Sequence, residues 1–195
     1  AQTGDIAASV NLDAGLCVSG SVAEVYSTGL VRASAASSLT GKRALRAWID
    51  LLFATAALNQ PIACRLFWYE KDAAKHRDLA SVTPGEARVK LTALVAAMRA
   101  GQRSPLPLFP QASWDALKRA RVQKGEAKAD EFVANLTAQT DPDADRAPGA
   151  DFLRPEVLMA WRGVDFGALD AHAANALYTT ARALLPTLQA GKPRT

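Results

Sequence analysis

The segment from residue 17 to residue 69 most constrains the fold, because it predicts two strands, a helix and a further strand in that order. Residues 18–26 and 30–33 are rich in β-branched side chains, which favour strands. Between them, Ser27-Thr28-Gly29 is typical of a hairpin turn, with glycine where a positive φ costs little. We therefore expect this segment to form the centre of a sheet.

A helix follows the second of these strands. Thr40-Gly41 is a plausible N-cap for this helix, and the apolar residues after it recur at the spacing of one helical face. Pro61 ends the helical pattern before an apolar strand at 62–69. That face is predicted to comprise Leu45, Trp48, Ile49, Leu52, Phe53 and Ala56. Before this unit, residues 5–12 predict a first strand. After it, residues 70–78 are interpreted as a charged loop, and residues 79–82 as a short edge strand.

The rest of the chain is predicted to be mostly helical. Thr83 and Glu86 form a capping-box pattern around Pro84, which is typical of a helix start. The inward face of this helix is predicted to comprise Val89, Leu91, Leu94, Val95 and Met98, with Gly101 at its end. An extended segment at 104–110 precedes helices around Trp114, around Phe132 and at 168–188, and residues 141–150 are interpreted as a loop.

These patterns predict a mixed α/β (α+β) fold, with a core sheet flanked by helices and a mostly helical C-terminal half. We expect residues 1–195 to form one domain, with an α/β core at 1–110 and a helical extension at 111–190. The 195 residues are 49% hydrophobic, which is typical of a folded globule. Without an initial methionine or a charged leader, the chain is expected to be an excised piece of a larger protein.

The net charge, the hydropathy and the cysteine content argue against a dedicated DNA-binding arm, a membrane-spanning protein and a disulfide-bonded or zinc-binding protein. A net charge of +4 is compatible with nucleic acid but far from the density of a dedicated DNA-binding arm. No apolar segment is long enough to predict a membrane span. Cys17 and Cys64 lie in predicted strands and are interpreted as buried, reduced thiols of a cytoplasmic protein. His76 and His172 lie far apart in the sequence, which leaves almost nothing from which to build a zinc site.

The strand–turn–strand–helix–strand unit resembles the core of the PD-(D/E)xK nuclease superfamily. There, a Gly-x-x-Asp strand and an Asp/Glu-x-Lys strand bind a hard metal ion that activates water. Here Ala23 stands in place of the aspartate, Ser34 and Ala36 stand in place of the acid and the lysine, and no Asp or Glu lies between residues 27 and 41. By strand alternation, Glu24 is expected to point away from Ala23. The resemblance therefore implies a fold without a catalytic or metal site.

A closer resemblance is to the C-terminal domain family of RecC, the gamma subunit of exodeoxyribonuclease V (RecBCD). Residues 45–52, 99–110 with Trp114, and 158–163 look like segments of that family, and the resemblance spans roughly residues 4–188. It implies a degenerate nuclease-like domain that helps to hold and split DNA in recombinational repair. It also implies RecB-like and RecD-like partner subunits, double-stranded and unwound DNA as ligands, and ATP and magnesium used by the partners alone.

Basic residues are the candidate DNA contacts, because sequence-independent binding depends on cations that displace counterions from phosphates. The candidates are Arg32, Lys42, Arg43 and Arg46 near the degenerate motif, and Lys118, Arg119 and Arg121 in a later helix. The later run is equally interpreted as a solvated face balanced by Glu126, Asp130 and Glu131.

Three adjacent aromatic residues, Phe67, Trp68 and Tyr69, could stack on a displaced base. Because neighbouring strand residues face opposite ways, at least one of them is expected to be buried. Trp48 and Trp161 are interpreted as core residues.

Two other classes of function stay open. One is a live nuclease whose carboxylates assemble from unusual positions, for which Asp5, Glu24, Asp50 and Glu70 are available. The other is a protein-interaction scaffold that makes no DNA contact.

Overall fold

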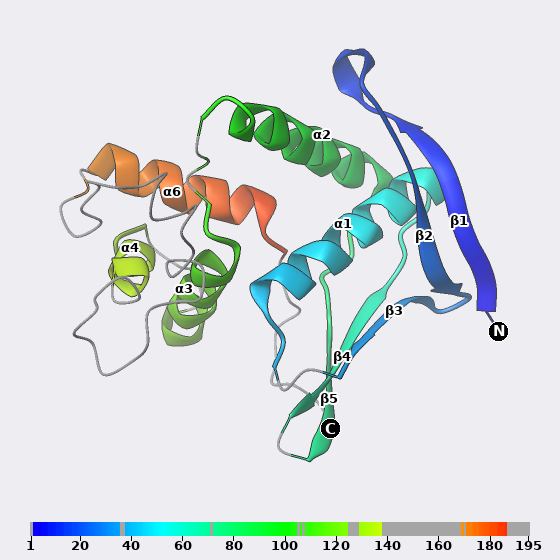
Figure 1. The fold of residues 1–195 in the computed structure, drawn as a ribbon, viewed down its shortest axis with the longest axis horizontal. Helices are drawn as coiled ribbons and strands as arrows, with labels where there is room; N and C mark the ends of the chain where they lie inside the picture. Colours follow the sequence, from blue (N-terminus) through cyan, green and yellow to red (C-terminus); the bar gives the residue numbers. More distant parts are fainter. Residues whose placement is uncertain are drawn as a thin grey trace. The chain divides into compact units, whose positions relative to one another are not determined.

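A computed structural model describes residues 2–35, 38–70, 72–104, 106, 108–124, 129–137, 169 and 171–186 (Figure 1). The strands are β1 (Gln2–Asn11), β2 (Cys17–Tyr26), β3 (Gly29–Ser34), β4 (Cys64–Glu70) and β5 (Ala73–Asp78). The helices are the 3-10 turn η1 (Asp13–Gly15), α1 (Gly41–Leu58), α2 (Pro84–Gly101), α3 (Pro110–Lys124), α4 (Ala129–Thr137) and α6 (Ala171–Leu184). The predicted mixed α+β class is confirmed, whereas the predicted loop at 141–150 and Trp161 lie outside the described residues.

The chain separates into two compact units. One comprises the described parts of residues 1–39, 43–96 and 186–195, and it contains the whole sheet with most of α1 and α2. The other comprises residues 40–42 and the described parts of 97–185, and it contains α3, α4 and α6.

The five strands form one mixed sheet in the order β1-β2-β3-β4-β5. β1 pairs with β2 and β2 with β3 antiparallel, through η1 and through the predicted turn at residues 27–28. β3 and β4 are parallel, so the chain must cross over between them, and α1 is that crossover. The ends of β2, β3 and β4 are thereby brought next to α1.

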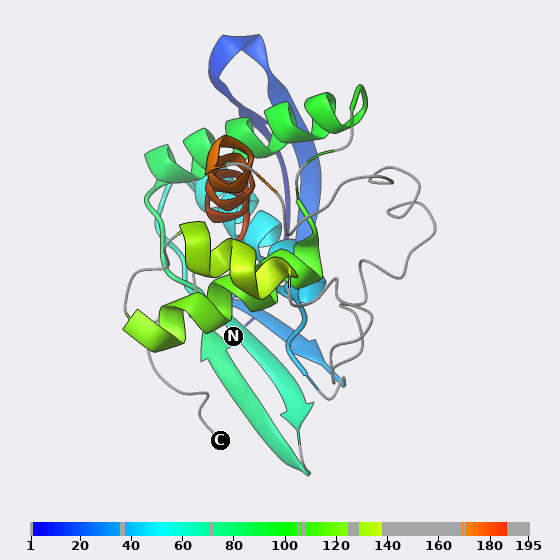
Figure 2. The same cartoon turned by 90° about the vertical axis from the view of Figure 1, so that its left-hand side faces the viewer.

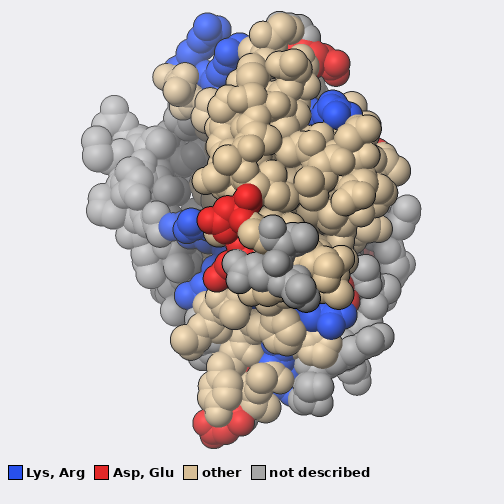
Figure 3. Space-filling view, turned by 90° about the vertical axis from the view of Figure 1, so that its right-hand side faces the viewer, with Lys and Arg blue, Asp and Glu red and all other residues tan. Residues whose placement is uncertain are grey.

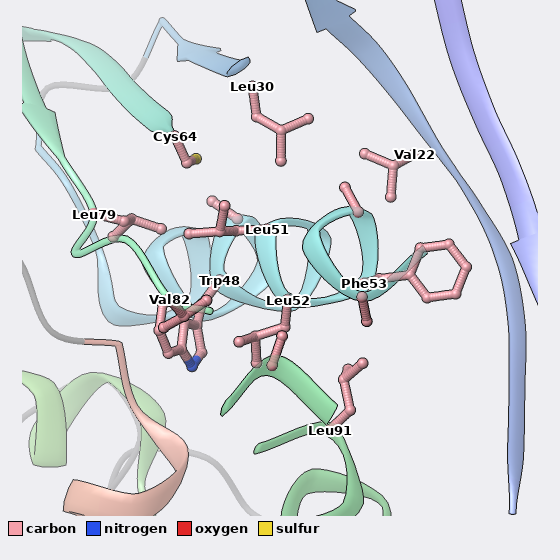
Figure 4. Packing of buried hydrophobic residues seen from close by; sticks show 14 of the residues in the cluster. Val22, Leu30, Trp48, Leu51, Leu52, Phe53, Cys64, Leu79, Val82 and Leu91 are labelled. Atoms are coloured by element: carbon pink, nitrogen blue, oxygen red, sulfur yellow. The ribbon is translucent and has the colours of Figure 1, made fainter. Parts of the chain in front are cut away.

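α1 packs between the sheet and α2, which explains why it is apolar on nearly every side. Figure 4 shows Leu51 directed toward Leu30 and Cys64 of the sheet, whereas Leu52 is directed toward Leu91 of α2. All five side chains are buried and belong to one hydrophobic cluster. The same cluster includes Trp48, whose predicted core position is confirmed.

Three apolar side chains that were predicted to face inward are exposed. Ile49 of α1 is 41% exposed, and Val89 and Met98 of α2 are 61% and 58% exposed. The predictions were wrong because α1 and α2 carry more apolar residues than one buried face needs. The spacing of apolar residues alone therefore does not predict which of these side chains pack against another element.

Within the predicted charged loop at 70–78, residues 73–78 instead form strand β5 and Glu70 ends β4. β5 pairs antiparallel with β4 from Arg65 opposite Asp78 to Glu70 opposite Ala73. The Arg65 guanidinium donates to both carboxylate oxygens of Asp78, at 2.7 and 3.0 Å. The predicted edge strand at 79–82 contributes only a single bridge residue, Leu79, whose amide donates to the Cys64 carbonyl at 2.9 Å.

The three described helices of the second unit pack on one another, and Figure 2 shows α4 beside α3 and α6. The rings of Phe132 in α4 and Tyr178 in α6 lie 5.7 Å apart. Phe132 and Leu136 are fully buried, as their spacing predicted. Gly41 belongs to this unit, and its amide donates to the Gln111 side-chain carbonyl at 2.7 Å.

The predicted capping box at the start of α2 is confirmed. The Glu86 carboxylate accepts from the Thr83 amide and hydroxyl, both at 2.8 Å, and the Glu86 amide donates to the Thr83 hydroxyl oxygen at 3.3 Å. Donation from the Thr83 backbone, and then from its side chain, holds the pKa of the Glu86 carboxyl below its usual range.

Replacing Thr83 with alanine should lower the free energy of unfolding by about 1 kcal/mol at neutral pH, because the helix loses its N-cap. A carboxyl with a lowered folded-state pKa stabilises the fold above its unfolded pKa, and this contribution disappears as the pH falls through the folded-state pKa. Urea denaturation should therefore show a smaller effect of Thr83→Ala in acid than at neutral pH. Thr92→Ala is the control, since Thr92 donates only to the Arg88 carbonyl within α2. A Thr83→Ala loss that does not shrink in acid would contradict the assignment.

Candidate functional site

A cavity of about 400 Å³ opens where β2, β3 and β4 meet α1. It brings together Ala23 and Ser34, two of the three positions that the sequence analysis predicted to be degenerate. The third, Ala36, lies outside the described residues. The lining residues are Ser21, Val22, Ala23, Glu24, Arg32, Ala33, Ser34, Ser38, Leu39, Arg43, Arg46, Ala47, Asp50, Leu66, Phe67 and Trp68.

Glu24 and Ala23 both line the cavity, and the expectation that their side chains point to opposite faces stays a prediction. A β-bulge interrupts β2 at this point: Ile6 pairs with Val22 and Gly4 pairs with Val25, which gives β2 one residue more than β1 over this interval. Bulges redirect side chains in this way. Glu24 itself has a left-handed φ of 57°, which costs a non-glycine residue about 1–2 kcal/mol.

Arg32 on β3 connects the two carboxylates of the cavity. Its Nε donates to Asp50 Oδ2 at 2.8 Å, and its Nη1 lies 3.7 Å from Glu24 Oε2. The same Nη1 donates to the carbonyl oxygens of Ala23 and Val31, each at 3.0 Å. The Arg32 and Asp50 side chains are 21% and 25% exposed, against 62% for Glu24, so the Asp50 contact is the better sheltered of the two.

Sequence reasoning placed Arg32 among the DNA contacts and did not foresee its pairing with Asp50. The two residues are 18 positions apart and meet only through the β3–α1 crossover. A signal was available, because Asp50 is the only acidic residue of the largely apolar helix α1. A charged side chain on a buried helix usually has a partner.

The other predicted basic contacts divide into three groups. Arg43 and Arg46 line the cavity, and Arg43 also donates to the Ser38 carbonyl at 3.2 Å. Lys42 is exposed in the first turn of α1 and is not a lining residue. The remaining three belong to α3, but their side chains lie outside the described part: Lys118, Arg119 and Arg121.

The aromatic triplet is split between the core and the surface. Trp68 is buried and its Nε1 donates to Glu70 at 3.0 Å, which confirms that at least one of the three is buried. Tyr69 is 51% exposed. Phe67 lines the cavity, and its ring centroid lies 5.5 Å from that of His76. Stacking of a base on Phe67 stays a prediction.

The two cysteines differ, contrary to expectation. Cys64 is buried, and desolvation raises the pKa of its thiol to about 12, although the nearby Arg32 charge acts in the opposite direction. This thiol therefore stays protonated and unreactive at neutral pH. Cys17 is exposed because it lies at the outer end of β2, beyond the reach of the helices, so its predicted burial was wrong.

The charged groups that line the cavity are the guanidiniums of Arg32, Arg43 and Arg46 and the carboxylates of Glu24 and Asp50. Among the described residues, no three His, Cys, Asp or Glu side chains gather where they could hold a metal ion. The arginines donate but do not accept protons, so none of them serves as a general base. Within the same part of the chain, no helix combines the length and apolar character needed to cross a bilayer.

The fold and the cavity together define a mixed α+β domain with a cavity at the sheet that is lined by three arginines and two acids. The family model of the RecC C-terminal domain matches residues 2–121, so the chain belongs to the RecC C-terminal domain family. The RecC family is part of the RecBCD exodeoxyribonuclease V complex, and membership gives the chain a role in that complex. A search of curated protein sequences finds no match to this chain.

Proposed function

We propose that this chain is a non-catalytic, nuclease-like domain of RecC that supports DNA unwinding, strand guidance and subunit assembly during double-strand-break repair in the cytoplasm. One observation carries the proposal: Arg32 lies between Glu24 and Asp50 in a cavity where Ala23 and Ser34 replace metal-binding residues. A magnesium ion needs open oxygen ligands, and here a guanidinium uses them.

Within this proposal, ATP hydrolysis and strand cleavage belong to RecB-like and RecD-like partner subunits, and this chain binds neither ATP nor magnesium. DNA would contact the basic side of the cavity through Arg43 and Arg46, with Lys42, Lys118, Arg119 and Arg121 as further candidates. That the whole of residues 1–195 acts as a single domain of a larger subunit stays a prediction.

An active nuclease with carboxylates at unusual positions would need several of the available acids to lie in one site, and only two of them do. Glu24 and Asp50 do meet in one cavity, whereas Asp5 and Glu70 are not among its lining residues. Incubating the purified chain with linear duplex DNA and Mg²⁺ tests this alternative directly. We expect no cleavage. Cleavage that requires Mg²⁺ and disappears in Glu24→Gln would overturn the proposal, since magnesium is held by carboxylate oxygens of this kind.

A scaffold without DNA contact is supported by a different surface. Figure 3 shows the side of the molecule on which β1 and β2 lie in Figure 1, and most of its described surface is uncharged. β1 and β2 contain only Asp5 and Glu24 as charged residues. We propose that this ribbon faces a partner subunit. Forked-DNA binding by the chain at a series of salt concentrations separates the two functions, because binding that is absent even at low salt would favour the scaffold.

A further inference from the structure

The guanidinium of Arg32 is enclosed by oxygen atoms of two carboxylates, Asp50 and Glu24, and of two backbone carbonyls, Ala23 and Val31. Hard divalent ions take oxygen ligands of these two kinds. A guanidinium is a permanent cation whose hydrogen atoms occupy the same lone pairs. Arg32 therefore supplies from within the chain the positive charge that the two carboxylates would otherwise draw from solution.

We propose that the cavity binds a phosphate group of a nucleic-acid strand without any divalent ion, and that Arg32 is the positioning residue that sets its charge. This inference rests on the proposed function and deepens it, since it names the ligand chemistry of the same site. The charged lining residues are three arginines and two acids, which leaves a formal charge of +1. The cavity thus has the sign that attracts a phosphodiester.

Arg43 and Arg46 are the phosphate contacts in this proposal. They lie one turn apart on α1 and both line the cavity, so their donors converge on one space. A guanidinium matches two phosphate oxygens at once. The hydroxyl-bearing residues Ser21, Ser34 and Ser38 line the same space. Its volume of about 400 Å³ is near the lower end of ligand pockets, which suits one unit of a strand rather than a duplex.

The bulge at Glu24 supports the same assignment independently. Val22 and Val25, on either side of Ala23 and Glu24, are both buried in the hydrophobic cluster, which the alternating faces of a regular strand would not allow. Instead, β2 takes up an extra residue and Glu24 a left-handed φ of 57°. Unfavourable backbone conformations of this kind concentrate where a side chain has to be aimed. Here the aimed carboxylate brings a second acid to Arg32.

The test uses residues 1–195 and two readouts. The first is fluorescence anisotropy of a short fluorescein-labelled oligothymidylate in EDTA, repeated with excess inorganic phosphate as competitor. The second is Mn²⁺ binding without DNA, measured by electron paramagnetic resonance. The variants are Arg32→Gln, the double variant Arg43→Gln/Arg46→Gln, and Arg65→Gln as a charge-matched control, since Arg65 pairs with Asp78 and does not line the cavity.

We expect the unaltered chain to bind the oligonucleotide in EDTA and to bind no Mn²⁺. Arg43→Gln/Arg46→Gln should weaken oligonucleotide binding by about tenfold or more without gain of Mn²⁺ binding. Arg32→Gln should weaken oligonucleotide binding and also gain Mn²⁺ binding, because the carboxylates are released. Arg65→Gln should change neither signal. If free inorganic phosphate displaces the oligonucleotide at a concentration much lower than a site for a nucleic-acid strand would require, the cavity is a site for free phosphate. That result would overturn the assignment to a strand.

A folded Arg32→Gln chain that gains no Mn²⁺ binding, or that binds the oligonucleotide normally, overturns the inference. If Arg32→Gln does not fold, Arg32→Lys replaces it. The lysine keeps the positive charge, so this variant should gain no Mn²⁺ binding. Oligonucleotide binding by this variant that requires Mg²⁺ would then overturn the inference. Failure here is distinguishable from failure of the proposed function. The latter is shown by Mg²⁺-dependent DNA cleavage, which none of these readouts measures.

Discussion

Replacing Gly29 with alanine should destabilise the fold by about 3 kcal/mol or more, which is a large effect for one methyl group. Gly29 begins β3 with a φ of 121°, a conformation that side chains rarely adopt. A Cβ at this position would also overlap the carbonyl oxygen of Ala63. The neighbouring amide of Leu30 donates to that same oxygen at 2.8 Å, so moving it away would break the hydrogen bond.

Equilibrium unfolding in urea measures this effect, and Gly20→Ala is the matched control. Gly20 lies in β2 of the same sheet, and a Cβ there would meet nothing within 4 Å. We expect the control to change the free energy of unfolding by no more than about 0.5 kcal/mol. Similar losses for the two variants would show that the β2–β3 turn is not built as described, and the cavity beyond it would then lose its support.

Replacing Leu51 with alanine should lower the free energy of unfolding by about 3 kcal/mol, within the range of roughly 2.7–5.0 found for buried leucines. Leu51 is fully buried on the side of α1 that faces Leu30 and Cys64 (Figure 4). The loss combines the transfer free energy of the deleted carbons with the cavity they leave. Urea or thermal unfolding of the purified chain provides the measurement.

Ile49→Ala on the same helix is the matched control, since Ile49 is 41% exposed. It should cost less than about 1 kcal/mol, because most of the deleted surface already contacts water. Comparing the two variants also tests the structure against the sequence pattern, because the pattern placed Ile49 on the buried face of the helix and did not include Leu51. A larger loss for Ile49→Ala than for Leu51→Ala would mean that α1 is rotated about its axis.

Local signals in the sequence identified much of this fold. The turn at 27–28, the start of α1 at Gly41 and the capping box of Thr83 and Glu86 all depend on neighbouring residues, so the sequence displays them directly. β5 was missed for the opposite reason. Its residues, Ala73–Asp78, are mostly polar, and they form a strand because β4 offers an unpaired edge.

The candidate site was predicted in part. The absence of Asp and Glu between residues 27 and 41 was visible in the sequence, and the structure places Ala23 and Ser34 in one cavity with Arg43 and Arg46. The partner of Arg32 was not visible, since Asp50 reaches it only through the crossover helix.

The sequence by itself determined the order of β1 to β4 with α1 and α2, the starts of these two helices, and the absence of Asp and Glu between residues 27 and 41. These follow from short-range backbone preferences and from residue identity. Only the tertiary structure decided which side of α1 is buried, that residues 73–78 join the sheet, and that a bulge turns Glu24 toward Arg32. Those outcomes depend on which distant segments meet, and the free energy of such contacts is not encoded in any local pattern.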